Sequence, residues 1–249
     1  MRIGRTGCRH RKLLAAALTA LLLTAMLCGT DAWAAQKKAG AKSVQKKEKV
    51  HTLYWKATLR RDVKAKGKTF KRGTSVVVVN RRTHSKSLVR CRGVLFKAPN
   101  SILSIKRDMS TAKKGDYSKE TKERFINGKK KASSKTRWLV WVSLDKQRVN
   151  VFCGSKGAWK LVKTFKCSTG KASTPTPPGW NTIDGKSYYF KGCKYYTEVC
   201  GSGMHKWPGA MNRKILGSHT VSHGCIRLTE SSARWIYKNV PRKTKTYVY

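Results

Sequence analysis

The chain has 249 residues, and its 56 Lys and Arg against 11 Asp and Glu give a formal net charge of +45 at pH 7. The length predicts one or two compact domains, and an aromatic content of 9% excludes a chain that is disordered throughout. Only one stretch is long and apolar enough to approach a membrane crossing, which excludes a membrane protein with several spans. The charge predicts an anionic partner, and nucleic acid, acidic lipid and an acidic wall polymer all satisfy it.

The first 34 residues have the layout of a secretory signal peptide. Five basic residues lie within 2–12, an apolar run fills 13–27, and Ala32-Trp33-Ala34 forms a cleavage site of the small-x-small type. We therefore expect an exported protein, at the extracellular face of the membrane or in the cell wall, cleaved after Ala34 or kept by an uncleaved anchor. Without these residues 51 basic and 10 acidic side chains remain, so the charge is +41. Export argues against a nucleic-acid partner.

Residues 35–50 are Lys-rich and have no apolar period, which predicts a flexible basic linker. Residues 51–108 hold five short apolar runs separated by turns, a pattern that predicts a small β-barrel. The stretch VKAKGKTFKRGTSVVV (63–78) resembles a bacterial SH3-like domain, and such modules commonly bind wall peptides. A spacer role is the alternative. The five predicted strands are 53–59, 75–79, 88–91, 94–97 and 102–105.

Residues 109–135 are polar and predict a linker between two domains. Within this linker, Tyr117–Ile126 is predicted as a short helix with Ser118 as its N-cap and with Phe125 and Ile126 as its apolar anchor.

The apolar density rises again in residues 136–249, which predict a larger, mostly β domain. One late helix is expected to begin after Thr229 as its N-cap and to run through Asn239, because Ala233, Ile236, Tyr237 and Val240 have helical spacing. The fold class is therefore mainly β, with a small barrel followed by a β-rich domain that has one late helix. The predicted strands of the larger domain are 137–143, 148–153, 159–167, 179–183, 188–190, 195–200 and 244–249.

The candidate chemistry lies in residues 203–228. Ser222-His-Gly-Cys-Ile-Arg227 places an imidazole two residues before a thiol, and Gly224 between them permits a sharp turn. A thiolate is a strong nucleophile, and the backbone N–H groups around Cys225 are candidates to hold a developing oxyanion. A second histidine, His205, lies 20 positions upstream of Cys225 and is its candidate partner in the folded chain. Most such cysteines and histidines are ordinary structural residues, so composition alone leaves both interpretations open.

The segment resembles the signature of the L,D-transpeptidase family, which has a YkuD-like catalytic domain. That signature is a histidine, a gap, Ser/Thr-His-Gly-Cys, an apolar residue, and Asn or Arg. Here 16 residues separate His205 from Ser222–Arg227, and every position is matched. Upstream, Cys167–Gly170 followed by Thr174–Gly179 is similar to the STG and TP.G stretch of the family. The resemblance covers residues 136–249, with three separated motifs in order, counting the strand-turn-strand that opens the domain.

Carried over residue by residue, the resemblance implies that Cys225 is the nucleophile and His205 the general acid/base. The sequence departs from the family pattern at Lys206, where the family often has Gly or Ser, and at an extra proline in Pro177-Pro178. Lys206 is harmless if its backbone carbonyl helps to orient the imidazole, and unfavourable if a small residue is required there. The residues implied to shape the oxyanion pocket and to orient the turn are Ser222, His223, Gly224 and Arg227.

The resemblance also implies acyl transfer that needs neither a cofactor nor a metal. Cys225 would attack the carbonyl of the third residue of a peptidoglycan stem tetrapeptide and release D-Ala. An amine of a neighbouring stem would then resolve the thioester into a 3→3 cross-link, a step of cell wall biogenesis and cell shape. His205 would carry the protons. Peptidoglycan stem peptides are thus the expected substrates, and anionic wall polymers are a further expected partner.

Three alternatives stay open. Water in place of the amine would make the protein an L,D-carboxypeptidase. An inactive catalytic domain would leave a basic wall-binding or structural protein. A nucleic-acid binder is permitted by the charge and opposed by the signal peptide.

Six cysteines follow residue 34, and an even number in an exported protein often indicates disulfides. If Cys225 is a working thiol, at least one of the other five is unpaired. Cys153 and Cys167 are expected in the core, whereas Cys193 and Cys200 flank a short strand and are close enough in sequence to pair. No CxxC occurs and the spacings do not form a zinc framework, so no metal site is predicted. The aromatic residues that could line a peptide groove or belong to the core are Tyr188, Tyr189, Tyr195, Tyr196 and Trp207.

Overall fold

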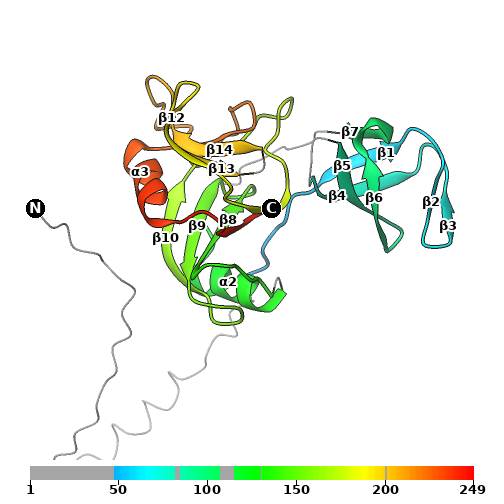
Figure 1. The fold of residues 1–249 in the computed structure, drawn as a ribbon, viewed down its shortest axis with the longest axis horizontal. Coiled ribbons are helices and arrows are strands. Elements are labelled where there is room, and N and C mark those ends of the chain that lie inside the picture. Colours follow the sequence, from blue (N-terminus) through cyan, green and yellow to red (C-terminus); the bar gives the residue numbers. More distant parts are fainter. Residues whose placement is uncertain (1–47, 82–84, 107–114, 130, 200) are drawn as a thin grey trace, which may run out of the picture. The chain divides into compact units, whose positions relative to one another are not determined.

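The computed structural model describes residues 48–81, 85–106, 115–129, 131–199 and 201–249 (Figure 1). The predicted signal peptide and most of the predicted basic linker therefore lie outside the described residues, as does Cys200. Within the described ranges, no helix has the length and apolar character needed to cross a membrane.

The first part of the chain forms a five-stranded antiparallel sheet with the order β6-β5-β4-β1-β7. All five predicted strands are confirmed. The loop that precedes β4 contains a further short hairpin, which the sequence did not predict because its residues are mostly Lys, Thr and Gly without apolar alternation. The bounds are β1 (Trp55–Leu59), β2 (Val63–Ala65), β3 (Lys68–Phe70), β4 (Ser75–Asn80), β5 (Lys86–Cys91), β6 (Val94–Pro99), a 3-10 turn (Asn100–Ile102) and β7 (Leu103–Lys106).

A short helix, α2 (Lys119–Arg124), precedes the larger domain and confirms the predicted helix. The hydroxyl of Ser118 accepts a hydrogen bond of 3.1 Å from the Thr121 N–H, which is the expected N-cap. Phe125 and Ile126 begin the following π turn (Phe125–Lys129) and are buried. The centroid of the Phe125 ring lies 4.7 Å from that of Trp141, and Ile126 belongs to the same buried cluster. Phe125 and Ile126 therefore anchor the helix to the larger domain.

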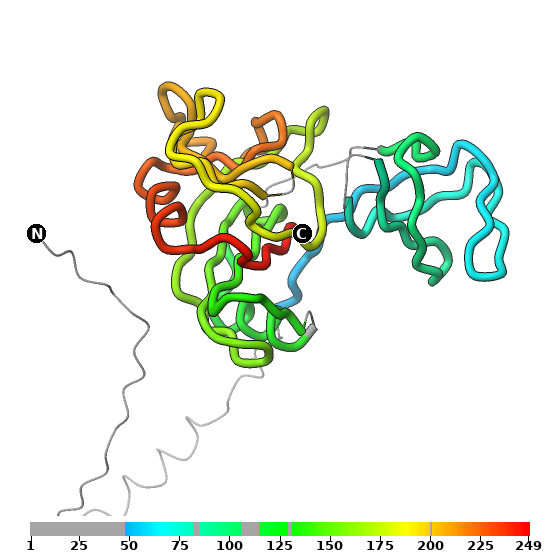
Figure 2. The backbone as a smooth tube through the Cα atoms, in the orientation of Figure 1, coloured from blue at the N-terminus to red at the C-terminus, as the bar shows by residue number. Residues whose placement is uncertain are grey.

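The larger domain, whose backbone runs from green to red in Figure 2, contains two sheets and one helix of ten residues. The first sheet has the order β10-β9-β8-β16-β11, and the second has the order β12-β13-β14-β15. The mainly β fold class is confirmed. The bounds are β8 (Trp138–Ser143), β9 (Arg148–Cys153), β10 (Lys160–Lys166), β11 (Gly179–Thr182), β12 (Lys186–Phe190), β13 (Cys193–Val199), β14 (Ser202–Lys206), β15 (Ile226–Leu228), α3 (Glu230–Asn239) and β16 (Lys245–Val248).

The helix α3 packs against β13 and β14 and confirms the predicted late helix. Thr229 caps it by accepting a hydrogen bond of 3.1 Å from the Ser232 N–H. Its buried side, Ala233 and Ile236, joins the same hydrophobic cluster as the buried residues of both sheets. Each large aliphatic side chain buried there contributes about 1.5–3 kcal/mol. This shared core holds the second sheet in place, and the second sheet carries the candidate site.

The strands β14 and β15 were not predicted, although they carry the candidate chemistry. Both are short, and the sequence around them is rich in Gly and polar residues, so neither shows a long apolar run. They form because each buries apolar side chains in the core: Met204 from β14, and Ile226 and Leu228 from β15.

Candidate active site

Parallel pairing of β14 and β15 brings His205 and Cys225 together. In this register Met204 lies opposite Ile226 and His205 lies opposite Arg227. Cys225 comes immediately before β15, two residues before Arg227, so its side chain emerges on the face that carries His205. Most of the 16-residue gap in the sequence thus lies in the connection between two neighbouring parallel strands.

The imidazole of His205 is oriented by a backbone carbonyl. Its Nδ1 atom lies 2.6 Å from the carbonyl oxygen of Lys206, and the ring is buried. A carbonyl oxygen only accepts hydrogen bonds, so Nδ1 carries a proton and Nε2 is the nitrogen left to exchange a proton with Cys225. The Lys206 side chain turns to Glu230, with Nζ 3.4 Å from the carboxylate. The departure from the family pattern at Lys206 therefore leaves the contact that orients His205 intact.

The thiol of Cys225 is partly buried and ionises easily. Burial alone raises the pKa of this thiol, but hydrogen bonds with His205 and Ser202, the charge of His205 and the Gly203 N–H outweigh that effect. The net result lowers the pKa of Cys225 to about 7. A large fraction of the thiol is therefore ionised near neutral pH, as a nucleophilic cysteine requires.

The turn before Cys225 is held by the side chain of Ser222. This buried hydroxyl accepts a hydrogen bond of 3.1 Å from the Gly224 N–H and donates one to the Cys225 carbonyl. Gly224 has φ +117°, a value that L residues with a side chain rarely adopt. Ser222 and Gly224 thus determine the direction in which the Cys225 side chain leaves the backbone.

A second segment, residues 168–176, supports this turn from the other side. Ser168 forms a bridge with Arg227, and Gly170 forms one with Ser222. The hydroxyl of Thr176 donates to the Gly224 carbonyl at 2.8 Å and accepts from the Gly170 N–H at 2.9 Å. The hydroxyl of Thr174 also donates to the turn, at the Ser222 carbonyl, 3.1 Å away. The sequence pattern marked this stretch as a motif but did not show that these two hydroxyls reach the turn.

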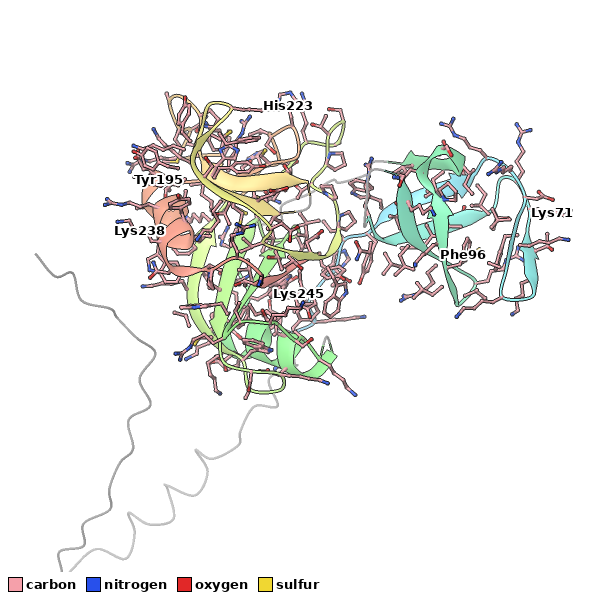
Figure 3. The ribbon with its side chains drawn as sticks, in the orientation of Figure 1. Lys71, Phe96, Tyr195, His223, Lys238 and Lys245 are labelled. Carbon is pink, nitrogen blue, oxygen red and sulfur yellow. The ribbon has the colours of Figure 1, made fainter. Side chains whose placement is uncertain are left out.

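The remaining predicted site residues lie around this centre. The guanidinium of Arg227 lies 5.3 Å from the ring centroid of Trp207, and its backbone pairs with Ser168. His223 is exposed (Figure 3). His219, which has no place in the motif, is also exposed, in a loop. An open cavity of about 240 Å³ lies beside the turn, with walls that include Ser173, Thr174, Pro175, Pro177, Ser202, His223 and Gly224.

The other cysteines differ from Cys225. Cys153 and Cys167 are buried, as predicted, and burial strongly raises the pKa of the Cys167 thiol. Cys193 is a free thiol whose pKa is raised by burial, and Cys200, its suggested partner, lies outside the described residues. Among the residues that the structure describes, no group of three His, Cys, Asp or Glu side chains is arranged to hold a metal ion.

The aromatic residues divide between core and surface. Tyr195 and Trp207 are buried, whereas Tyr188 and Tyr189 are exposed. The ring of Tyr196 lies beside the imidazole of His205, with 6.3 Å between the ring centroids and 25° between the planes.

Comparisons with known proteins show which family this part of the chain matches. Residues 137–248 match the YkuD family, the L,D-transpeptidase catalytic domain. A Bacillus subtilis (strain 168) protein named "Putative L,D-transpeptidase YciB" is 24% identical over 186 residues, which are 60% of this chain and 93% of that protein.

Two solved structures are also similar to this chain. A Clostridium acetobutylicum ATCC 824 protein, described as a fused Zn-dependent amidase/peptidase/peptidoglycan-binding domain-containing protein, is 34% identical with a TM-score of 0.44. The match covers 53% of this chain and 59% of that one. An L,D-transpeptidase from Mycobacterium smegmatis is 16% identical with a TM-score of 0.39, over 76% of each chain. Residues 137–248 thus match the L,D-transpeptidase catalytic domain, and the structure brings Cys225 and His205 together within this part of the chain.

Proposed function

We propose that this protein is an exported cysteine L,D-transpeptidase that forms 3→3 cross-links between peptidoglycan stem peptides through a thioester on Cys225. The observation that carries the proposal is the thiol of Cys225 beside an imidazole whose Nδ1 proton is held by the Lys206 carbonyl. That pair of groups is a nucleophile with its base, within a catalytic domain of the matching family.

In the first step, Nε2 of His205 takes the thiol proton and the Cys225 sulfur attacks the carbonyl carbon of the third residue of a donor tetrapeptide. A C–S bond forms and the C–N bond to D-Ala breaks. His205 returns its proton to the departing amine, so the step leaves a thioester and neutral D-Ala amine. The oxyanion that develops between these events is stabilised by backbone N–H groups near the turn.

In the second step, an amine from the third residue of a neighbouring stem attacks the thioester. His205 accepts a proton from this amine, the C–S bond breaks, and the electron pair returns to sulfur. The product is a 3→3 cross-link and the starting form of the enzyme. Water in place of the amine gives L,D-carboxypeptidase activity from the same thioester.

The supporting residues keep this geometry. Ser222 and Gly224 shape the turn that presents the thiol, and Arg227 anchors the strand that follows it through its pairing with Ser168. His223 is exposed at the cavity wall, which suits a contact with substrate.

The proposal extends to the rest of the chain. The signal peptide would deliver the protein to the wall, the sheet of residues 55–106 would act as an SH3-like module for wall peptides, and the charge of +41 would favour anionic wall polymers.

The direct test compares the wild type with Cys225→Ala on purified wall fragments that carry tetrapeptide stems. We expect 3→3 dimers from the wild type and none from Cys225→Ala, with Cys193→Ala as a matched control that removes a free thiol and keeps activity. Equal amounts of product from the wild type and Cys225→Ala would overturn the enzyme proposal and favour the inactive wall-binding alternative. Intact mass after incubation with a carbapenem should show one adduct, which Cys225→Ala abolishes.

A second measurement addresses location. Mature protein is expected outside the membrane, without residues 1–34. Recovery of the mature protein inside the cell would instead favour the nucleic-acid alternative.

A further inference from the structure

A serine hydroxyl lies against the sulfur of Cys225. Ser202 begins β14, three residues before His205, and its Oγ atom is 3.1 Å from the Cys225 Sγ atom. A thiolate only accepts hydrogen bonds, so the hydroxyl is the donor once the thiol is ionised. Both side chains are partly buried, which reduces the competition from water for this contact.

Tyr196 determines where Ser202 lies. Its phenolic OH donates a hydrogen bond of 2.8 Å to the Ser202 carbonyl. Its ring lies over Gly203, where an added Cβ would come within 2.1 Å of the Tyr196 ring carbon Cε2. Because Gly203 has no side chain, the ring can approach the backbone this closely, and the strand at Ser202 cannot move without displacing the ring.

We propose that Ser202 is a catalytic residue whose hydroxyl stabilises the Cys225 thiolate, and that Tyr196 is a positioning residue that holds Ser202 against the sulfur. The inference rests on the proposed function, since it takes Cys225 to be the nucleophile. A hydrogen bond to an ionised acceptor is roughly twice as strong as one between neutral groups, so the hydroxyl favours the thiolate over the thiol.

The role of Ser202 differs from that of His205 because the hydroxyl stays neutral throughout the reaction. His205 is charged or neutral according to which proton it has just moved. When the thioester breaks and the electron pair of the C–S bond returns to sulfur, the Ser202 hydroxyl is a donor whatever the charge of the imidazole. The two residues therefore support the same sulfur independently.

The test measures how fast iodoacetamide alkylates Cys225 across a range of pH, followed by the mass of the peptide that contains Cys225. For Ser202→Ala we expect the midpoint of the alkylation profile to rise by about one pH unit, so that the rate at pH 7 falls about fivefold. Ser202→Thr keeps the hydroxyl and should keep the wild-type midpoint. Tyr196→Phe keeps the ring but loses its OH, and should give a smaller rise.

The matched control is Ser187→Ala, because Ser187 lies in β12 of the same sheet and its hydroxyl binds only the nearby Tyr189 carbonyl at 2.8 Å. It should leave the profile unchanged. A folded Ser202→Ala variant with the wild-type midpoint overturns the proposal, even if cross-linking by the wild type is confirmed. Should Ser202→Ala fail to fold, an unchanged midpoint in Tyr196→Phe overturns it instead.

The same experiment separates the two levels of inference. Alkylation reports the ionisation of the thiol and does not need turnover. A wild-type midpoint of about 8.5, typical of an ordinary cysteine, would overturn both the activated nucleophile and the role of Ser202. A low wild-type midpoint that Ser202→Ala leaves unchanged would overturn only the role of Ser202.

Discussion

The hydroxyl of Thr176 donates a hydrogen bond of 2.8 Å to the carbonyl of Gly224, 48 residues further along the chain. Thr176 is fully buried and also accepts a hydrogen bond from the Gly170 N–H. One side chain thus links the segment 168–176 to the turn that presents Cys225. The position of Cys225 therefore depends on this link as well as on the motif around it.

Replacing Thr176 by Val should therefore disturb the site from a distance. The substitution keeps the shape of the side chain but leaves the Gly170 N–H and the Gly224 carbonyl without this partner, which should lower the free energy of unfolding by about 1–3 kcal/mol. Displacement of the turn should slow acylation by a carbapenem by at least about tenfold. Urea denaturation and stopped-flow acylation measure the two effects. Thr69→Val, at an exposed position in β3, is the control and should change neither quantity. Acylation of Thr176→Val at the wild-type rate would show that the turn keeps its shape without the Thr176 hydroxyl.

Replacing Lys206 by Ser should change cross-linking little, because the contact that orients His205 comes from the backbone carbonyl. The variant loses the ion pair with Glu230, and a surface pair of this kind contributes about 0–1 kcal/mol. We expect kcat/KM within about threefold of the wild type, whereas His205→Gln should abolish activity. A large loss in Lys206→Ser would mean that the side chain itself is needed.

The pH dependence of acylation should follow the ionisation of Cys225. The pKa of this thiol is lowered to about 7, so the reactive thiolate increases as the pH rises through 7 and declines below it. Acylation by a carbapenem should rise by about tenfold for each pH unit below 7 and level off above it. In His205→Gln the midpoint should move upward, because the hydrogen bond and the charge of the imidazole are lost. A profile with the same midpoint in both proteins would contradict the pairing of His205 with Cys225.

Gly224→Ala should inactivate the protein through the backbone. An added Cβ would find space, since its nearest atoms, Ser202 Oγ and the Thr174 carbonyl oxygen, lie 3.8 Å away. The φ of +117° is the obstacle, and relieving it would rotate the turn that carries Cys225. Gly192→Ala is the matched control, because Gly192 also has a positive φ, of +79°, with open space around it. Both variants should lose stability in thermal unfolding, but only Gly224→Ala should lose acylation by a carbapenem.

Binding to isolated cell wall should depend steeply on salt if the charge of +41 is what attracts an anionic polymer. We expect the bound fraction of the Cys225→Ala protein to fall as the NaCl concentration rises from about 0.05 to 0.5 M, where the Debye length shortens several-fold. Sedimentation with purified wall measures it. Binding that is insensitive to salt would remove the electrostatic explanation and favour recognition by the small β domain.

The sequence by itself predicted Cys225 as the nucleophile and His205 as its partner, and it predicted most of the strands that the structure shows. A short, mostly apolar run bounded by turn residues, such as 148–153, indicates a buried strand, and this pattern is visible in the sequence alone. The Ser-His-Gly-Cys motif and its distance from His205 are likewise local or nearly local features. The cap residues Ser118 and Thr229 were predictable for the same reason, since each acts within its own turn.

Only the tertiary structure decided how these residues meet. Parallel pairing of β14 and β15, two strands too short to be predicted, places His205 beside Cys225. The sequence left the role of the Lys206 carbonyl as one of two possibilities, and the structure decided between them by placing this carbonyl 2.6 Å from Nδ1 of His205. Thr176 and Ser202 act through contacts with residues 48 and 23 positions away, and a hydroxyl in a sequence carries no sign of which distant atom it will reach. Such contacts arise only when the shared core of the two sheets brings separate segments into hydrogen-bonding distance.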